Sequence, residues 1–142
     1  MIEIKDVGHI GIRVADEAVA MKFYELLGFK LRKRADGDAV TIMSNDANVE
    51  INLVINANDN CGGKNILMDV PEKIPGLTHV AYNVASLKET IKVLAENDIE
   101  IRQGPVKFPG GDHVAIFIRD PDLNVIELRS HGEDIETEKY IP

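Results

Sequence analysis

Residues 8–15, Gly-His-Ile-Gly-Ile-Arg-Val-Ala, match residues 78–85, Thr-His-Val-Ala-Tyr-Asn-Val-Ala, when the chain is aligned with itself at an offset of 70 residues. The residue types agree over about 25 positions without a gap. With small further shifts, residues 49–53 also resemble residues 124–128. Two copies of about 50 residues indicate a duplicated supersecondary unit.

Each copy is predicted to be a strand, a helix and three further strands. The alternation of apolar and polar residues in 7–14 is typical of a half-buried strand. Asp16 is a good N-cap and Gly28 a good C-terminal stop, and Ser86 opens a capping box in the second copy. The other predicted strands are 29–34, 38–44 and 48–55 in the first copy, and 79–84, 99–103, 112–119 and 124–130 in the second, with a turn at 36–38.

The sequence therefore predicts a single α+β domain of 142 residues made of two βαβββ modules. The first module covers about 5–56 and the second about 76–131. Residues 57–75 are rich in Asn, Gly, Asp and Pro and are interpreted as the linker. Residues 132–142 form an acidic tail.

Composition excludes several classes of partner. The chain has 16 basic and 24 acidic residues, a net charge of −8, and no basic stripe, so nucleic acid and anionic membranes are poor candidates. No apolar run reaches the length of a membrane span, and no secretory signal is visible, so we expect a cytoplasmic protein. Cys61 is the only cysteine, which excludes an internal disulfide and a zinc site built from several cysteines.

One face of the predicted strands carries the functional signal. His9 and His79 occupy matching positions of the repeat, and each is followed two residues later by a small residue, Gly11 or Ala81. Glu127 lies on the corresponding face of the last strand. A sheet face that meets water is also polar. The repeated histidines and the carboxylate nevertheless favour a divalent transition metal site.

Four segments together resemble a known family: His-Ile-Gly-Ile-Arg-Val from residue 9, Phe-Tyr-Glu-Leu-Leu-Gly-Phe from 23, Leu-Thr-His-Val-Ala-Tyr from 77, and Phe-Ile-Arg-Asp-Pro-Asp-Leu-Asn-Val-Ile-Glu-Leu from 117. The chain resembles the vicinal oxygen chelate superfamily, which contains glyoxalases, bleomycin-resistance proteins and extradiol dioxygenases. The resemblance covers about residues 5–131. It implies a cup-shaped mixed sheet around a metal and, as in many members, a homodimer.

The resemblance implies that His9, His79 and Glu127 bind a divalent metal, which is Ni, Zn, Fe or Mn. A fourth ligand in glyoxalase I is usually Glu. Alignment of the two copies places Asn52 at that position. Glu50 lies two residues earlier, on the same face of the predicted strand. Asn is neutral and a poor transition-metal ligand, so we favour three protein ligands, with Glu50 as the alternative fourth ligand or a pocket base.

The function implied is a glyoxalase I-like lyase or isomerase, which acts on a small carbonyl or thiol-adduct substrate by an enediolate-type proton transfer. Glu127 and Glu50 are the candidate catalytic carboxylates. Arg13 and Asn56 match residues that hold glutathione in glyoxalase I and are candidate substrate-binding residues. The methylmalonyl-CoA epimerase branch, which uses the same enolate chemistry, stays open.

Two alternatives remain. The first is an extradiol-type dioxygenase with a two-His, one-Glu triad on Fe(II). Those enzymes have a tyrosine ten residues before the carboxylate ligand, where this chain has Phe117. His113 shares a face with Phe117 and is a candidate pocket acid–base group or an ordinary exposed histidine. The second alternative is a non-catalytic resistance-type binding protein, against which the absence of Trp weighs.

Overall fold

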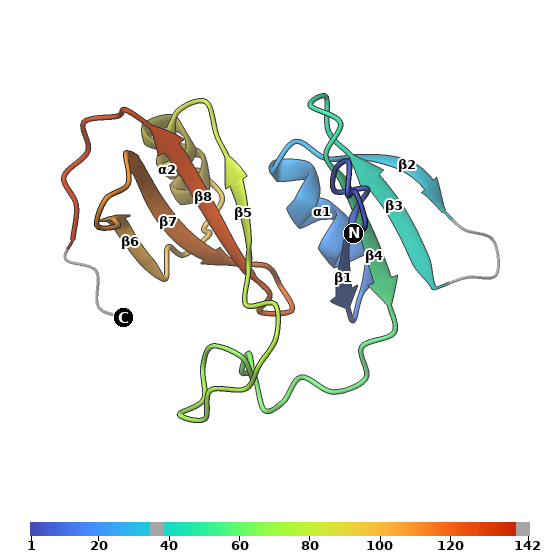
Figure 1. Ribbon diagram of the computed structural model, residues 1–142. Coiled ribbons are helices and arrows are strands. Elements are labelled where there is room, and N and C mark those ends of the chain that lie inside the picture. The colour runs from blue at the N-terminus through green and yellow to red at the C-terminus, as the bar shows by residue number, and fades with distance from the viewer. Residues whose placement is uncertain (35–38, 139–142) are drawn as a thin grey trace. The chain divides into compact units, whose positions relative to one another are not determined.

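The computed structural model describes residues 1–34 and 39–138 (Figure 1). The predicted turn at 36–38 and the end of the acidic tail, 139–142, lie outside the described residues. The chain divides into two compact units, Met1–Gly63 and Lys64–Pro142. Each unit contains one four-stranded mixed sheet and one helix, which confirms the predicted α+β class.

The first unit follows the predicted order of a strand, a helix and three strands. Its sheet has the order β1-β4-β3-β2, in which β1 and β4 are parallel and the other pairs are antiparallel. The helix contacts β2 and β4. The elements are β1 (Ile10–Val14), α1 (Glu17–Leu26), β2 (Lys30–Arg34), β3 (Val40–Ser44) and β4 (Glu50–Ile55).

The second unit repeats this arrangement. Its sheet has the order β5-β8-β7-β6, and β5 and β8 are its parallel pair. The helix contacts β8, the strand next to β5. The elements are β5 (Val80–Asn83), α2 (Leu87–Glu96), β6 (Gln103–Lys107), β7 (His113–Arg119) and β8 (Val125–His131).

Strand register confirms the duplication and the alignment of the two copies. Ile10 lies opposite Ile51 and is followed by the pair Gly11 and Asn52. In the second sheet, Val80 lies opposite Ile126 and is followed by the pair Ala81 and Glu127. Asn52 therefore holds in β4 the position that Glu127 holds in β8.

The helix boundaries agree with the local sequence signals. The side chain of Asp16 accepts a hydrogen bond from Val19 N at 2.9 Å, and Ser86 accepts one from Glu89 N at 3.3 Å. After α1, Gly28 adopts a positive φ of 89°, a backbone conformation that glycine reaches without steric cost. These contacts satisfy backbone groups that a helix end leaves unpaired.

The starts of three predicted strands differ from the structure. β1 begins at Ile10 and β5 at Val80, so His9 and His79 each lie one residue before their strand, because ladder pairing starts only there. The strand predicted at 99–103 is found at Gln103–Lys107. Ile99 N donates to Leu94 O and so belongs to the helix terminus. Pro105, which cannot donate to a ladder, is tolerated because β6 is the outer strand of its sheet.

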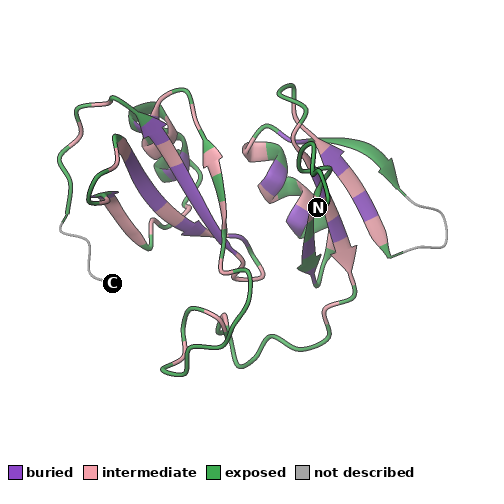
Figure 2. Ribbon diagram, viewed as in Figure 1, coloured by how far each residue is buried: buried purple, intermediate pink, exposed green. Residues whose placement is uncertain are grey.

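Each sheet buries one face against its helix and leaves the other more accessible (Figure 2). The buried faces are aliphatic and aromatic, as the alternation predicts. No helix in the described part of the chain is long and apolar enough to cross a membrane. The largest buried apolar side chains are Val14, Tyr24, Met43, Ile51 and Leu53 in the first unit, and Leu87, Leu94, Val106, Ile116, Ile118 and Ile126 in the second.

Candidate metal and substrate site

The second unit brings a histidine and a carboxylate together on the open face of its sheet. Glu127, in the middle of β8, lies between Ala81 of β5 and Phe117 of β7. Its side chain is buried, with 9% of its surface exposed. His79 Nε2 lies 3.1 Å from Glu127 Oε2. Two of the three predicted metal ligands are therefore neighbours in this unit.

Thr78 orients the His79 ring. Thr78 Oγ1 lies 2.9 Å from His79 Nδ1, within hydrogen-bond distance. When Nδ1 donates this hydrogen bond, Nε2 carries the lone pair and faces Glu127. Metal-binding histidines are commonly held this way through their second nitrogen. The sequence prediction missed Thr78, although its place directly before the predicted ligand was a usable signal.

The geometry of the pair fits a bound transition metal. Two donors at about 2.1 Å from one ion are about 3.0 Å apart at a right angle and about 3.4 Å apart at the tetrahedral angle. The observed separation of 3.1 Å, which is also that of an ordinary ion pair, lies within this range. One imidazole nitrogen and one carboxylate oxygen also suit Zn, Ni, Mn or Fe. Within residues 1–34 and 39–138, no three His, Cys, Asp or Glu side chains form a metal-binding group. The third predicted ligand, His9, belongs to the first unit and lies exposed just before β1.

Asn52 has an unsatisfied acceptor in the first unit. It lies between Gly11 of β1 and Ile42 of β3. Its Oδ1 is buried and has no hydrogen-bond partner among the described residues. A Cβ added to Gly11 would meet no atom within 4 Å, so the strand beside Asn52 is uncrowded. Since an unpaired buried acceptor costs about 1–3 kcal/mol, this amide is suited to receive a donor or a cation.

Glu50 begins β4 and lies opposite Ser44 of β3. It is half-buried and two residues before Asn52, so the two side chains share a face of the strand. The register assigns Asn52, and not Glu50, to the position equivalent to Glu127.

Arg13 and Asn56, the predicted substrate-binding pair, contact each other. Arg13 Nε donates to Asn56 Oδ1 at 2.9 Å. Together with residues 57–59 they line an open cavity of about 380 Å³ in the first unit. The cavity walls are mainly polar side chains and backbone, which suits a charged or strongly polar group.

Phe117 and His113 lie on the same face of β7 as the carboxylate site, because Phe117 pairs with Glu127 and His113 with His131. The Phe117 ring contacts the His79 ring edge-on, with centroids 5.7 Å apart. Phe117 is therefore placed beside the candidate ligands. His113 is further along the strand, where its ring lies 5.1 Å from that of His131.

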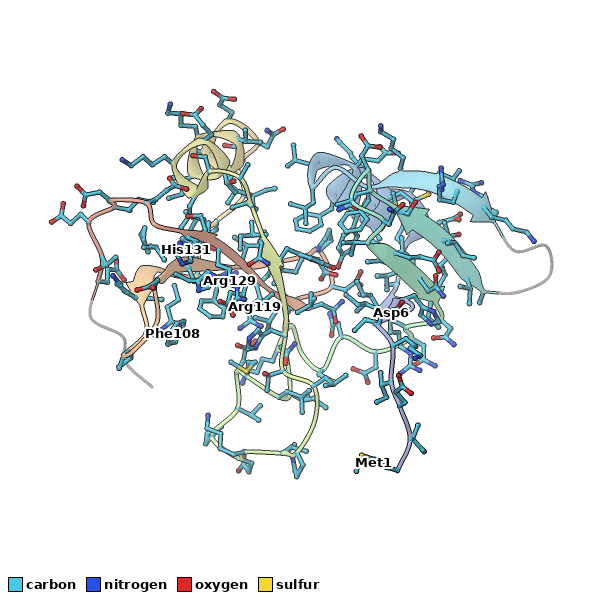
Figure 3. The ribbon with its side chains drawn as sticks, turned by 45° about the horizontal axis from the view of Figure 1, so that its top comes forward. Met1, Asp6, Phe108, Arg119, Arg129 and His131 are labelled. Atoms are coloured by element: carbon cyan, nitrogen blue, oxygen red, sulfur yellow. The ribbon has the colours of Figure 1, made fainter. Side chains whose placement is uncertain are left out.

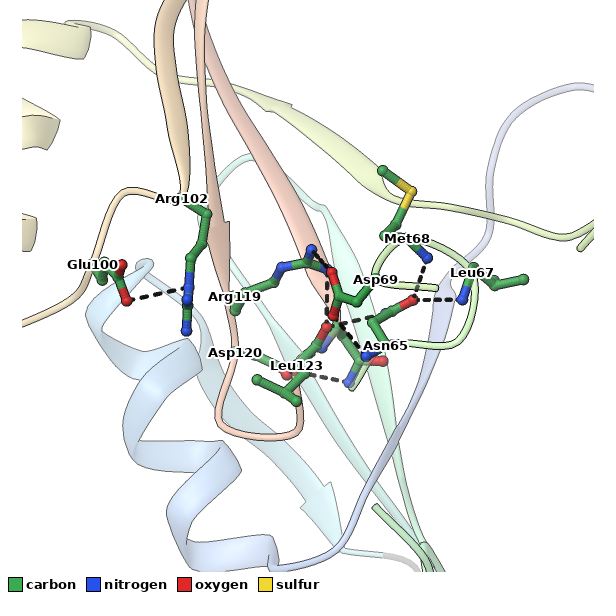
Figure 4. A network of polar contacts seen from close by, with 10 residues as sticks. Asn65, Leu67, Met68, Asp69, Glu100, Arg102, Arg119, Asp120 and Leu123 are labelled. Atoms are coloured by element: carbon green, nitrogen blue, oxygen red, sulfur yellow. Dashed lines mark hydrogen bonds and ion pairs between the residues drawn. The ribbon is translucent and has the colours of Figure 1, made fainter. Parts of the chain in front are cut away.

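Arg119, at the end of β7, is held by a polar network (Figure 4). Its Nη2 lies 2.7 Å from Asp69 Oδ1, and its Nη1 donates to Leu123 O at 3.3 Å. Asn65 Nδ2 donates to the same carbonyl at 3.0 Å. These contacts tie residues 65–69, within the predicted linker, to the β7–β8 turn, and Asp69 neutralises the charge of Arg119.

Comparison with known families agrees with this arrangement. The family model for the Glyoxalase/Bleomycin resistance protein/Dioxygenase superfamily matches residues 6–128. The chain belongs to this superfamily. The match spans both units and includes His9, His79 and Glu127.

Individual members of the glyoxalase/dioxygenase superfamily are distant from this chain. The glyoxalase domain-containing protein RDO1 of Mycosarcoma maydis is 27% identical over 135 residues, which are 93% of this chain and 72% of that protein. A glyoxalase family protein from Enterococcus faecalis has a TM-score of 0.72 at 25% identity, with 88% of this chain and 97% of that chain covered. A glyoxalase/dioxygenase from Nostoc punctiforme has a TM-score of 0.71 at 20% identity, over 91% and 92% of the two chains. The structural matches support the fold.

Proposed function

We propose that this protein is a metal-dependent, glyoxalase-type lyase or isomerase that acts on a small carbonyl or thiol-adduct substrate. The observation that carries the proposal is the contact of His79 Nε2 with Glu127 Oε2 at 3.1 Å on an open sheet face. His79 and Glu127 would hold the metal, and His9, in the first unit, is the predicted third ligand. A bound divalent metal polarises the substrate carbonyl and lowers the cost of removing a proton from the adjacent carbon.

The protein's own groups have separate roles in this proposal. Thr78 holds the His79 ring with Nε2 toward the metal position. A carboxylate, Glu127 or Glu50, takes the proton from the carbon beside the carbonyl and returns it to the neighbouring carbon. Arg13, held by Asn56, binds a charged part of the substrate.

Phe117 favours proton-transfer chemistry over the extradiol dioxygenase alternative. It lies directly opposite Glu127, at the position where the related dioxygenases have a tyrosine. A phenylalanine there provides no hydroxyl to an oxygen-bearing intermediate. Its apolar ring instead limits water beside the carboxylate, which strengthens the electrostatic interactions of the site.

Metal content tests the proposal. Protein purified without a chelating column is analysed for bound metal, and Ni²⁺ and Zn²⁺ are titrated into the metal-free form. His79→Ala, His9→Ala and Glu127→Gln are each expected to lower affinity by orders of magnitude, because two remaining ligands do not complete a coordination shell. The control is His131→Ala, which removes an exposed histidine from the same strand as Glu127. Unchanged metal binding in the three ligand variants would refute the assignment.

Turnover assays separate the remaining functions. The methylglyoxal–glutathione hemithioacetal tests lyase activity, and oxygen consumption with catechol tests the dioxygenase alternative. We expect turnover of a carbonyl substrate that is lost in Glu127→Gln. A protein that binds no metal and turns over neither substrate class would contradict both catalytic hypotheses and favour the binding-protein alternative.

A further inference from the structure

Arg129 shares the open face of the second sheet with Glu127. The two residues are separated by one position on β8, so their side chains leave the same face, with Cα atoms about 7 Å apart. Asn83 of β5 and Ala115 of β7 lie on either side of Arg129. Ala115, the direct neighbour of Arg129 on β7, has only a methyl group. Figure 3 labels Arg129 beside His131 on this unit.

The guanidinium of Arg129 is oriented by a neutral group. Its Nε donates to Asn83 Oδ1 at 3.0 Å. Arg119, on the neighbouring strand, instead has a carboxylate partner in Asp69 at 2.7 Å. Among the described residues, Asn83 is the sole polar partner of Arg129, and it occupies Nε, so the two terminal nitrogens have no partner there.

This arrangement favours the binding of an anion by the Arg129 guanidinium. Arg129 is half-buried, and its one polar contact among the described residues is neutral; a cation taken partly out of water without a carboxylate in direct contact is destabilised. A guanidinium held through Nε presents its terminal nitrogens in a planar fork that matches a carboxylate. A purely structural link between β5 and β8 is the simpler role. Such a link, however, needs no positive charge, since two neutral side chains would make the same hydrogen bond.

We propose that Arg129 binds a second anionic group of the substrate and so selects short carbonyl compounds with a distal carboxylate. The inference rests on the proposed function, because that function places the reacting carbonyl at His79 and Glu127. The carboxylate then lies about 7 Å along β8, beyond a short methylene chain. Asn83 is a positioning residue, since it holds the guanidinium without touching the substrate.

A matched pair of probes tests this selection. 2-Oxoglutarate and 2-oxovalerate have the same chain length and the same keto-acid end, and differ only in a terminal carboxylate or methyl group. Isothermal titration measures both with metal-free and Ni²⁺-loaded protein. The wild type is expected to prefer 2-oxoglutarate by about tenfold or more, the range of a charge-assisted hydrogen bond. Arg129→Met is expected to abolish this preference, and Arg129→Lys to retain part of it.

Arg102→Ala is the control, because it removes the same charge from an exposed ion pair with Glu100. It is expected to keep the full preference. Equal affinity of the wild type for the two probes, or a preference that survives in Arg129→Met, overturns the inference. If Arg129→Met does not fold, Asn83→Ala decides: a weakened preference supports the role of Arg129 and an unchanged preference contradicts it.

The test of Arg129 can fail or succeed independently of the test of the proposed function. The ratio of the two affinities in metal-free protein reports on Arg129, whether or not His79 and Glu127 bind metal. Intact metal binding with no preference between the probes would leave the metal site standing and remove Arg129 from the substrate site. A preference for 2-oxoglutarate without metal binding would support Arg129 as an anion-binding residue and contradict the metal site at His79 and Glu127.

Discussion

Asn52 occupies in β4 the register position that Glu127 occupies in β8. Each lies opposite a small residue of the parallel neighbouring strand, Gly11 or Ala81. The two units thus share one backbone arrangement and differ in charge at the equivalent point. Asn52 Oδ1, which has no hydrogen-bond partner among the described residues, lies at the position where the second unit has the Glu127 carboxylate.

A glutamate introduced at position 52 tests whether this position, like that of Glu127, can bind the metal. Asn52→Glu is expected to tighten metal binding roughly tenfold, about 1.4 kcal/mol, because a charged oxygen ligand replaces a neutral one. Glu50→Gln is the comparison, since it removes a carboxylate from the same face of β4 and should leave metal affinity unchanged. Calorimetric titration of both variants measures the effect. Equal losses of affinity in Glu50→Gln and Glu127→Gln would identify Glu50 as the ligand instead.

Thr78 is expected to support metal binding through the His79 ring. Thr78→Val keeps the shape of the side chain and removes the hydroxyl near Nδ1. Loss of such a supporting hydrogen bond commonly weakens metal affinity by ~10–100-fold, and we expect that range here. Thr90→Val, which removes a hydroxyl from α2, serves as the control. A Thr78→Val protein with wild-type affinity would show that the ring is held by other contacts.

Glu133 is expected to make the stability of the second unit depend on pH. Its carboxylate accepts hydrogen bonds from Leu87 N and Lys88 N at the start of α2, and these bonds lower its pKa from the ordinary value of 4.5. The charged form is therefore favoured in the folded state. Its stabilising effect is present above about pH 4.5 and is lost as the pH falls through the lowered pKa.

Thermal unfolding of Glu133→Gln across this pH range measures the effect. The variant is expected to melt below the wild type at neutral pH, and the difference should shrink under acidic conditions. Glu136→Gln, a change at an exposed carboxylate of the same tail, should have little effect at either pH. A difference that stays constant down to pH 3 would mean that charge at Glu133 is not involved.

We expect the protein to form a homodimer. The N-terminal segment leaves Ile2, Ile4 and Val7 largely exposed, and a segment with several exposed apolar residues favours a partner surface. Light scattering at micromolar concentration should give twice the mass of one chain. Ile4→Lys is expected to shift the equilibrium toward monomer, whereas Leu31→Lys, at another exposed apolar residue, is the control. A monomer at all concentrations would contradict the prediction.

Local signals in the sequence were sufficient for most of the fold. The repeat at an offset of 70 residues, the N-caps Asp16 and Ser86, and the alternation within each strand all involve residues close together in the chain. Their effects on backbone conformation are short-range, so the sequence alone determines them. The identity of Asn52 as the counterpart of Glu127 also followed from the sequence, because it needed only the alignment of two copies.

The hydrogen bonding at the end of α2, and the contacts between distant residues, needed the tertiary structure. Ile99 N bonds back to Leu94 O, so the strand predicted at 99–103 starts later, at Gln103. Glu133, distant in the sequence, accepts hydrogen bonds from Leu87 N and Lys88 N at the start of α2. The orientation of Arg129 by Asn83 likewise depends on β5 and β8 lying side by side. Such contacts are set by strand register and side-chain rotamers, and residues 46 positions apart carry no local signal of them.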